Sequence, residues 1–498
     1  MRINLSLKYI LTLLVLMCQG CATYATYQRS AAFERPPEYI RFINLLDQAV
    51  KETGVRNAAD FPVGGFPYLR TNRFLTALKD HLDSDERKEQ WVRRLQQLDL
   101  DARRKEIQNL PADDLTDLAH QLGEPADRKI LFDRLAFYSE QLLTGDQRRP
   151  DFSTILQAAV TSPSEYSTAM RVVGIYPLTC IPVAAVTRNV QDKFTKRLRV
   201  PVDQLETLGE LTAYGPLRSE PYSERSVRLI LDRSRQNPLE IPQLSDADQK
   251  LLLAMFAPVV YQDIAAAYDK IGEVVWHDNK VGINPDRPTV YYYSSHALLK
   301  GKPILQLNYV FWYSARNGPL APWIERGPLD GLTVRVSLDN DGRPFMVDIM
   351  NNCGCYHFFL PSRQKIAKLI PLPDELDAFV PRRLPASYPQ ERLRLRMMSG
   401  WHQVAHIDST ATAAALVPYE LAPYERLEML PRQDRTYESI FNSNGIGKNS
   451  GRIEPLIFFP MGIPDIGSMR QRGHHAVKFI GREHFDDPDL FDKNFEFK

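Results

Sequence analysis

The feature that most constrains the fold of this chain is a change in its hydrophobic pattern near residue 270. Upstream of that point, apolar residues recur at intervals of three and four, which is the period of an amphipathic helix. Downstream, short runs of β-branched and aromatic residues are separated by turn residues, as in strands. Segregation of this kind predicts an α+β fold, with a helical domain in residues 41–270 and a β-rich domain in residues 271–498.

Several helices can be placed from their period and their start signals. They are expected at residues 39–52, as two or three solvated helices within residues 73–109, and after each of Pro111 and Pro125. Ser245 and Asp248 form a capping pattern ahead of a further apolar run over residues 251–268. Pro258 lies inside that run and is expected to kink or split its helix.

The strands can also be predicted from short local runs of residues. They are expected at residues 289–293, 304–313, 332–338 and 344–350. The turn sequence at residues 339–342 (DNDG) predicts that the last two strands form a hairpin. Residues 393–407 alternate with period two, so a continuous strand there would place His402, Val404 and His406 on one face.

Residues 170–187 are apolar but are interrupted by Pro177 and Pro182. A membrane span needs roughly 20 uninterrupted apolar residues, so this segment is not predicted to span a membrane. It is either a buried connection or a surface patch that dips into lipid. The buried alternative is the one that we favour from the sequence.

The charge balance excludes one broad class of function. The chain of 498 residues has 62 basic and 61 acidic residues, which gives a formal net charge of +1. Binding to nucleic acid requires a clustered basic excess, so no nucleic-acid partner is expected. The hydrophobic content of 44% and charged content of 25% are those of a folded protein rather than a disordered one.

The N-terminus indicates where the protein is located. Residues 1–20 have the order of a secretory signal, because basic residues precede the apolar run 9–17, which is too short to span a bilayer. Cys21 follows directly, and this arrangement resembles the lipobox of bacterial lipoproteins. The resemblance implies that Cys21 is diacylated as the first residue of the mature chain, and Ala22 implies sorting to the outer membrane. The alternatives are cleavage to a soluble secreted form and an uncleaved membrane anchor.

Residues 21–40 show neither a helical nor a strand period and contain Pro36-Pro37, which suits an extended tether between the lipid anchor and the folded body. The body is therefore expected in the cell envelope, held to the outer membrane and facing the periplasm or the cell surface. The membrane is the one partner that the sequence implies through its lipidated N-terminus.

Histidine is distributed unevenly. Of the ten histidines only His81 and His120 precede residue 270. Neutral imidazole is a good ligand for zinc and related transition metals, so one hypothesis is a metal site in the β-rich domain. Its candidate ligands are His357, His402, His406 and His475. The alternative is that these rings form hydrogen bonds within a polar core.

Cysteine chemistry gives a further hypothesis. Apart from Cys18 in the signal and Cys21, the chain has Cys180, Cys353 and Cys355, so one thiol must remain outside any intramolecular disulfide. The segment 353–356 (CGCY) and the later segment 475–481 (HAVKFIG) resemble the cysteine and histidine segments of papain-like peptidases. That resemblance implies a thiolate nucleophile activated by an imidazole.

The sequence therefore predicts a membrane-anchored envelope lipoprotein that acts as a binding or structural module. The first alternative is a metal-dependent periplasmic enzyme, hydrolase-like, that uses the histidine cluster and a divalent metal such as zinc. The second is a hydrolase with a cysteine and a histidine.

Overall fold

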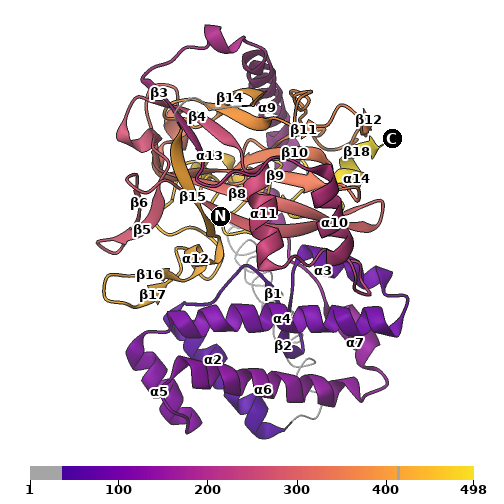
Figure 1. Ribbon diagram of the computed structural model, residues 1–498. Coiled ribbons are helices and arrows are strands. Elements are labelled where there is room, and N and C mark those ends of the chain that lie inside the picture. The colour runs from indigo at the N-terminus through magenta and orange to yellow at the C-terminus, as the bar shows by residue number, and fades with distance from the viewer. Residues whose placement is uncertain (1–35, 412–415, 498) are drawn as a thin grey trace, which may run out of the picture.

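A computed structural model describes residues 36–411 and 416–497 of the chain. It has an α+β fold in which a helical layer lies below a large curled sheet (Figure 1), so the predicted fold class is confirmed. The signal segment, Cys21 and residues 22–35 of the expected tether lie outside the described residues. The end of that tether differs from the prediction, because Pro37 already opens the first described helix.

The helical layer is built from the N-terminal part of the chain. Its elements are α2 (Pro37–Thr53), β1 (Phe61–Val63), β2 (Phe66–Thr71), α3 (Arg73–Leu78), α4 (Asp85–Asn109), α5 (Ala112–Leu122), α6 (Arg128–Gln147) and α7 (Phe152–Ala159). Side-chain caps fix two of the starts, because Ser84 accepts from the Arg87 amide and Asp127 accepts from the Ile130 amide. Helices α2 to α6 lie where the sequence predicts helices, so these predictions are confirmed.

A mixed sheet of ten strands forms the upper part of the described structure. Its strand order is β11-β10-β9-β8-β7-β15-β3-β4-β13-β14. The strand bounds are β3 (Glu210–Pro216), β4 (Val259–Ile264), β7 (Thr289–Leu299), β8 (Lys302–Arg316), β9 (Gly327–Leu338), β10 (Pro344–Asn351), β11 (Phe358–Pro361), β13 (Arg392–Met397), β14 (Val404–Thr410) and β15 (Val417–Pro423). Strand β15 pairs in parallel with both β3 and β7, and β13 pairs in parallel with β4.

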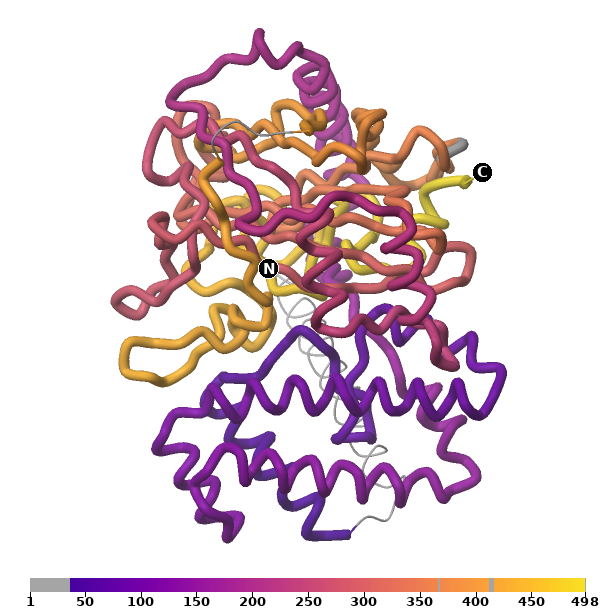
Figure 2. Tube along the Cα trace, in the orientation of Figure 1, coloured from indigo at the N-terminus to yellow at the C-terminus, as the bar shows by residue number. Residues whose placement is uncertain are grey.

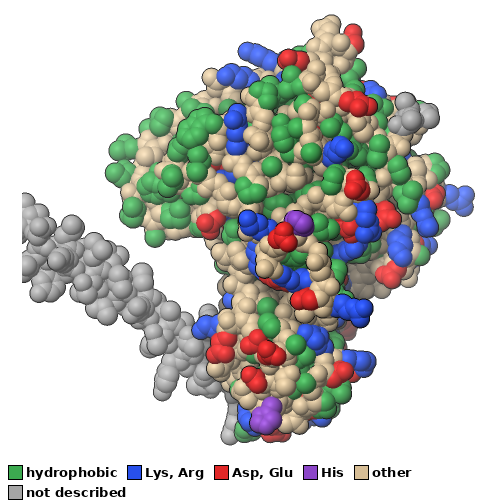
Figure 3. All heavy atoms as spheres, turned by 90° about the vertical axis from the view of Figure 1, so that its left-hand side faces the viewer, with side chains coloured by type: hydrophobic (Ala, Val, Ile, Leu, Met, Phe, Trp, Pro, Cys, Tyr) green, Lys and Arg blue, Asp and Glu red, His purple; other side chains and the backbone are tan. Residues whose placement is uncertain are grey.

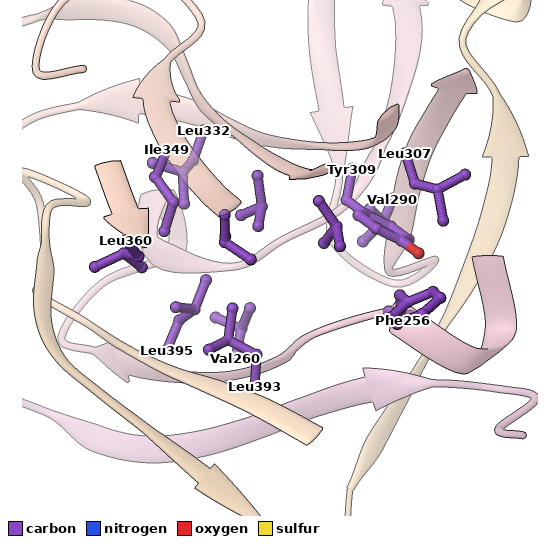
Figure 4. Close-up of a cluster of buried hydrophobic side chains, with 14 of the residues drawn as sticks. Phe256, Val260, Val290, Leu307, Tyr309, Leu332, Ile349, Leu360, Leu393 and Leu395 are labelled. Carbon is purple, nitrogen blue, oxygen red and sulfur yellow. The ribbon is translucent and has the colours of Figure 1, made fainter. Parts of the chain in front are cut away.

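The sheet curls so that its two ends face each other across one hydrophobic core (Figure 4). Leu332, Ile349 and Leu360 project from β9, β10 and β11 toward Val260 and Leu395 from β4 and β13. Each of these five side chains is at most 2% exposed. At roughly 25 cal/mol per Å² of apolar surface removed from water, burial of this core is the main force that holds the curled sheet.

Three helices cover the sheet with apolar faces. They are α9 (Tyr176–Leu198), α10 (Glu224–Ser234) and α11 (Asp246–Phe256), which contribute Phe194, Val227 and Leu252 to the main core. Strands β3 and β4 also lie within the range 41–270 that we expected to be helical. The sheet therefore takes two of its strands from upstream of residue 271, where the strand pattern was expected to begin.

Two of the local expectations near these elements differ from the structure. Ser245 caps α11 as predicted, by accepting from the Asp248 amide, but the helix ends at Phe256 and residues 259–264 form a strand. The predicted continuous strand at 393–407 is also wrong. A turn at residues 398–403 separates β13 from β14, and His402 lies in that turn with φ of 50°. His402 therefore does not share a strand face with His406.

The apolar segment 170–187 is not the buried connection that we favoured. It forms α8 (Thr168–Val173) and the first half of α9, and several of its large apolar side chains are exposed. Within the described residues, no helix has both the length and the apolarity that a membrane crossing requires.

The two layers are joined by buried polar contacts. Glu428, which follows β15, accepts hydrogen bonds from Lys105 of α4 at 2.6 Å and from Arg472 at 3.0 Å. The C-terminal segment returns to the sheet layer, where α14 (Leu490–Asn494) leads into β18 (Phe495–Phe497) beside β12 (Ile366–Leu369). Figure 2 shows the N-terminal part below and this last segment above.

Candidate ligand-binding pocket

A cavity of about 250 Å³ lies between α9, the strand β11 and the irregular C-terminal segment. Helix α9 is held over this space by Phe194, whose ring lies 5.1 Å from that of Phe358 and 5.8 Å from that of Phe379, measured between ring centroids. Phe194 is 5% exposed and belongs to the main core. Helix α9 and the sheet therefore form two fixed walls of the cavity.

Most of the wall is apolar. The apolar lining residues are Val183, Val186, Val190, Phe194, Ile324, Phe358, Phe359, Leu376, Ala378, Phe379, Phe458, Val477 and Phe479. A concave site lined by such groups and a few polar ones is the usual form of a small-molecule pocket. This composition suits a ligand with an apolar body.

The polar part of the lining centres on Glu325. Its carboxylate accepts from the Tyr356 hydroxyl at 2.5 Å, from the Trp401 indole nitrogen at 2.9 Å and from Arg316 at 2.6 Å. Arg316 in turn holds Asp330 through two hydrogen bonds. Glu325 is thus fully engaged with protein donors and serves as a fixed, charge-compensated part of the wall.

Glu454 differs from Glu325. It also lines the pocket and is only 5% exposed, but no donor from the described residues reaches its carboxyl group. Burial, together with the nearby Cys353 and Glu325, raises the pKa of Glu454 to about 8. A buried carboxyl group without a partner is costly, so this side chain offers a bond to a donor supplied by a ligand.

The two thiols of the CGC segment lie next to this carboxyl group. Cys355 lines the pocket, and Cys353 lies behind it at 3% exposure. A hydrogen bond from the Cys355 thiol and the charge of Arg316 lower the pKa of Cys353 to about 7, whereas the pKa of Cys355 is raised well above its ordinary value. Both thiols are free, as is Cys180.

His357 also lines the pocket, as do the polar residues Thr187, Gln191, Asp377, Lys478 and Glu483. Its Nε2 lies 2.8 Å from the Asp348 carboxylate, which Arg335 also binds in bidentate fashion. Although burial raises the pKa of Asp348, Arg335 and His357 hold it below its ordinary value. The ring is therefore fixed in orientation by an ionised carboxylate, while its Nδ1 makes no hydrogen bond with the described residues.

His402, a second predicted ligand, belongs to a separate buried network. Its ring stacks on Tyr313 at 3.9 Å between centroids, and its two nitrogens contact Asp330 at 2.8 Å and Asp269 at 3.1 Å. Burial opposes a charged ring, but the two carboxylates outweigh it and raise the pKa of His402. This arrangement is that of a buried ion network, which Arg316 connects to the pocket residue Glu325.

The remaining two predicted ligands lie elsewhere. His406 is on β14, where burial and Arg382 lower its pKa. The Nε2 of His475 lies 3.2 Å from the Asn352 carbonyl oxygen, and burial and then Arg470 lower its pKa to about 3, so this neutral ring donates to the carbonyl. Among the described residues, no three His, Cys, Asp or Glu side chains converge as metal ligands. The structure therefore does not bring His357, His402, His406 and His475 to one point.

The two segments that resemble a papain-like site do lie side by side. A Cβ atom built on Gly354 would lie only 2.4 Å from the Ala476 carbonyl oxygen, so only glycine, here with φ of +92°, fits this contact. The His475 ring nevertheless turns toward the Asn352 carbonyl, and no hydrogen bond joins either Cys353 or Cys355 to an imidazole of the described chain. The expected thiol–imidazole pair is thus not formed in this geometry.

Cys180, the third predicted thiol, lies on α9 among Met461 and Ile480, and Cys21 lies outside the described residues. Sequence analysis missed Glu325 and Glu454. An isolated glutamate carries no local signal, because its role depends on which distant side chains surround it after folding.

The comparisons with known proteins add no family to this description. No protein-family model matches the chain, and no curated protein and no solved structure is detectably similar to it. The functional argument therefore depends on the pocket itself.

Proposed function

We propose that this protein is a lipid-anchored module of the cell envelope that binds a small apolar ligand in the pocket beneath α9. One observation carries the proposal: a cavity of about 250 Å³ has apolar walls and one buried carboxyl group, Glu454, without a protein donor. A ligand that supplies a donor there gains a hydrogen bond that the protein alone leaves unmade.

The pocket suggests a chemical class for this ligand. The walls favour an aliphatic chain or aromatic ring, and Glu454 favours an amine or hydroxyl head. The metal-dependent alternative would need three ligands around one point, and the cysteine–histidine alternative would need a thiol in contact with an imidazole. The described side chains provide neither arrangement, so binding is the function with the most support.

The ligand proposal is tested with N-phenyl-1-naphthylamine, an apolar fluorescent probe that carries one N–H donor. Val190→Trp fills the pocket from α9, and we expect it to reduce probe binding at least tenfold. Ala185→Trp places the same bulk on the exposed side of that helix and serves as the matched control. Equal probe binding by the parent protein and both variants would overturn the proposal.

The lipid anchor is tested separately. Cells fed radiolabelled palmitate should incorporate label into the parent protein and not into Cys21→Ser. Label retained in that variant would show that the lipobox resemblance is misleading. Probe binding by the purified protein does not depend on this result.

A further inference from the structure

Ten exposed apolar side chains of the described structure lie in two segments that pack against each other. Those in the α8–α9 region are Val172, Val173, Ile175, Leu178, Ile181 and Val186, and those near α13 (Pro455–Phe458) are Ile453, Leu456, Ile457 and Phe459. Val173 is 75% exposed and Leu456 is 81% exposed. We call these ten residues the docking face. Figure 3 shows hydrophobic side chains crowded on the upper left flank, the side on which α9 lies.

The first half of α9 is apolar all round, although only one side of it is covered. Ala184 and Phe194 point into the body of the protein, whereas Leu178, Ile181 and Val186 are each at least 60% exposed. A helix that is hydrophobic on all sides is normally buried on all sides. The outer side of α9 therefore lacks a covering surface within this chain.

The two parts of the docking face are joined by one backbone and one side-chain hydrogen bond. The Ser167 amide donates to the Gly462 carbonyl at 2.7 Å, and Arg171 donates to the Met461 carbonyl at 2.9 Å. These contacts hold α8 against the turn that follows α13. The apolar side chains of the two parts therefore lie on neighbouring elements, whereas the exposed residues Phe137 and Leu229 lie on α6 and α10.

The charges around the docking face suit an anionic surface. No acidic residue occurs between residues 166 and 191, and Glu454 in the other part is buried. Farther along α9, the exposed side chains Arg188, Lys193 and Lys196 are accompanied by one acid, Asp192. Apolar side chains flanked by basic ones are typical of helices that lie in the interface of a phospholipid membrane.

We propose that the docking face inserts into the surface of the phospholipid membrane that holds the lipid anchor. Fourteen residues separate Cys21 from Pro36, and a chain of that length reaches at most about 50 Å. The anchor thus keeps the body near a bilayer, and the docking face defines which side of the body meets it. This inference depends on the anchor in the proposed function and not on the ligand.

Docking in this orientation would place the pocket at the membrane. Val186 lines the cavity and is also 60% exposed on the docking face, and Phe458 of α13 lines the cavity from the other side. The pocket therefore opens next to the surface that meets lipid. An apolar ligand would pass from the bilayer to the pocket without crossing water.

The test uses the lipidated full chain in vesicles of phosphatidylethanolamine and phosphatidylglycerol, with and without brominated acyl chains. Leu178→Trp adds a fluorophore to the docking face, and Phe137→Trp adds one at an exposed position on α6. Difference spectra against the parent protein remove the signal of the native tryptophans. We expect a blue shift and bromine-dependent loss of emission for Leu178→Trp and neither change for Phe137→Trp.

Each other outcome would contradict docking. A blue shift at position 178 without bromine quenching would mean that a second copy or another protein covers this face. Equal quenching at both positions would mean that the body has no preferred side toward the membrane. Failure of both variants to float with the vesicles would overturn docking together with the anchor, whereas flotation without quenching would overturn docking alone.

Discussion

Glu454 is the residue on which the chemistry of the pocket depends. Its neighbour Glu325 is satisfied by Tyr356, Trp401 and Arg316, so two carboxylates on one wall have different roles. Glu325 is part of the scaffold. Glu454 has a pKa raised to about 8, so it is mostly protonated at neutral pH. Its carboxyl group accepts no hydrogen bond from the described residues.

The titration of Glu454 gives a stability prediction. The pKa of a glutamate in the unfolded chain is about 4.3, so the folded state holds this proton more tightly. Stability from the protonated form is complete below about pH 4.3 and is lost as the pH rises toward 8, by up to about 1.4 kcal/mol per pH unit. Glu454→Gln should therefore flatten the decline in the free energy of unfolding over this window.

Urea unfolding at several pH values between 5 and 9 measures this effect. Glu420→Gln, at an exposed position on β15, is the control and should follow the parent protein. Parallel curves for the parent and Glu454→Gln would show that Glu454 is not in the buried, unpartnered state described.

At the scale of elements, the pocket exists because α9 is fixed to the sheet by a few aromatic contacts. Phe194 packs on Phe358 and Phe379, and its removal would leave a cavity beneath the helix. Phe194→Ala should cost about 3 to 5 kcal/mol of stability and abolish probe binding. The matched change Phe137→Ala, at a half-exposed position on α6, should alter stability by less than about 0.5 kcal/mol.

Thermal unfolding and probe titration of both variants provide the readout. If Phe194→Ala bound the probe as the parent does, then α9 would not form a wall of the binding site.

Elements also show how far local sequence signals reach. The Ser245 cap and the DNDG hairpin turn were predictable, because each depends on residues within a few positions of one another. The break between β13 and β14 could not be predicted from local residues. Strand β13 pairs in parallel with β4, and this pairing depends on residues that are distant in the sequence. For the same reason the sequence indicated His402 as a possible ligand but gave no sign that Asp269 and Asp330 surround it.

The exposure of the apolar segment 170–187 also depends on contacts that local sequence does not reveal. Its composition favours a buried connection, but periodicity does not identify the covering surface, and the structure exposes several of its large apolar side chains. Glu454 was invisible for a related reason, because burial of an isolated carboxyl group is a tertiary property.

For the whole molecule, Glu428 joins the helical layer to the sheet layer. Burial raises the pKa of Glu428, but Arg472 and Lys105 outweigh it and lower this pKa to about 2. Its contribution to stability is therefore present above about pH 4.3 and is lost as the pH falls toward 2. Glu428→Gln leaves the Lys105 charge buried without its counterion and should cost about 3 to 5 kcal/mol.

Calorimetry should show this loss as a lower melting temperature, with unfolding of the helical layer separated from that of the sheet layer. Asp133→Asn removes one partner of the exposed Lys129–Asp133 pair on α6 and should leave the melting profile unchanged. A single unaltered transition in Glu428→Gln would mean that the layers are held together by other contacts.

The central claim is that the space beneath α9 is a ligand-binding pocket, and photolabelling tests it most directly. A diazirine-bearing alkylamine is crosslinked to the full-length protein, and the labelled residues are located by peptide mass spectrometry. The account predicts labels on the pocket-lining side chains Val183 and Val190 of α9 and on Phe458 and Phe479, with loss of these labels in Val190→Trp. Labels confined to exposed positions such as Val173 and Leu456, and unchanged in that variant, would contradict it.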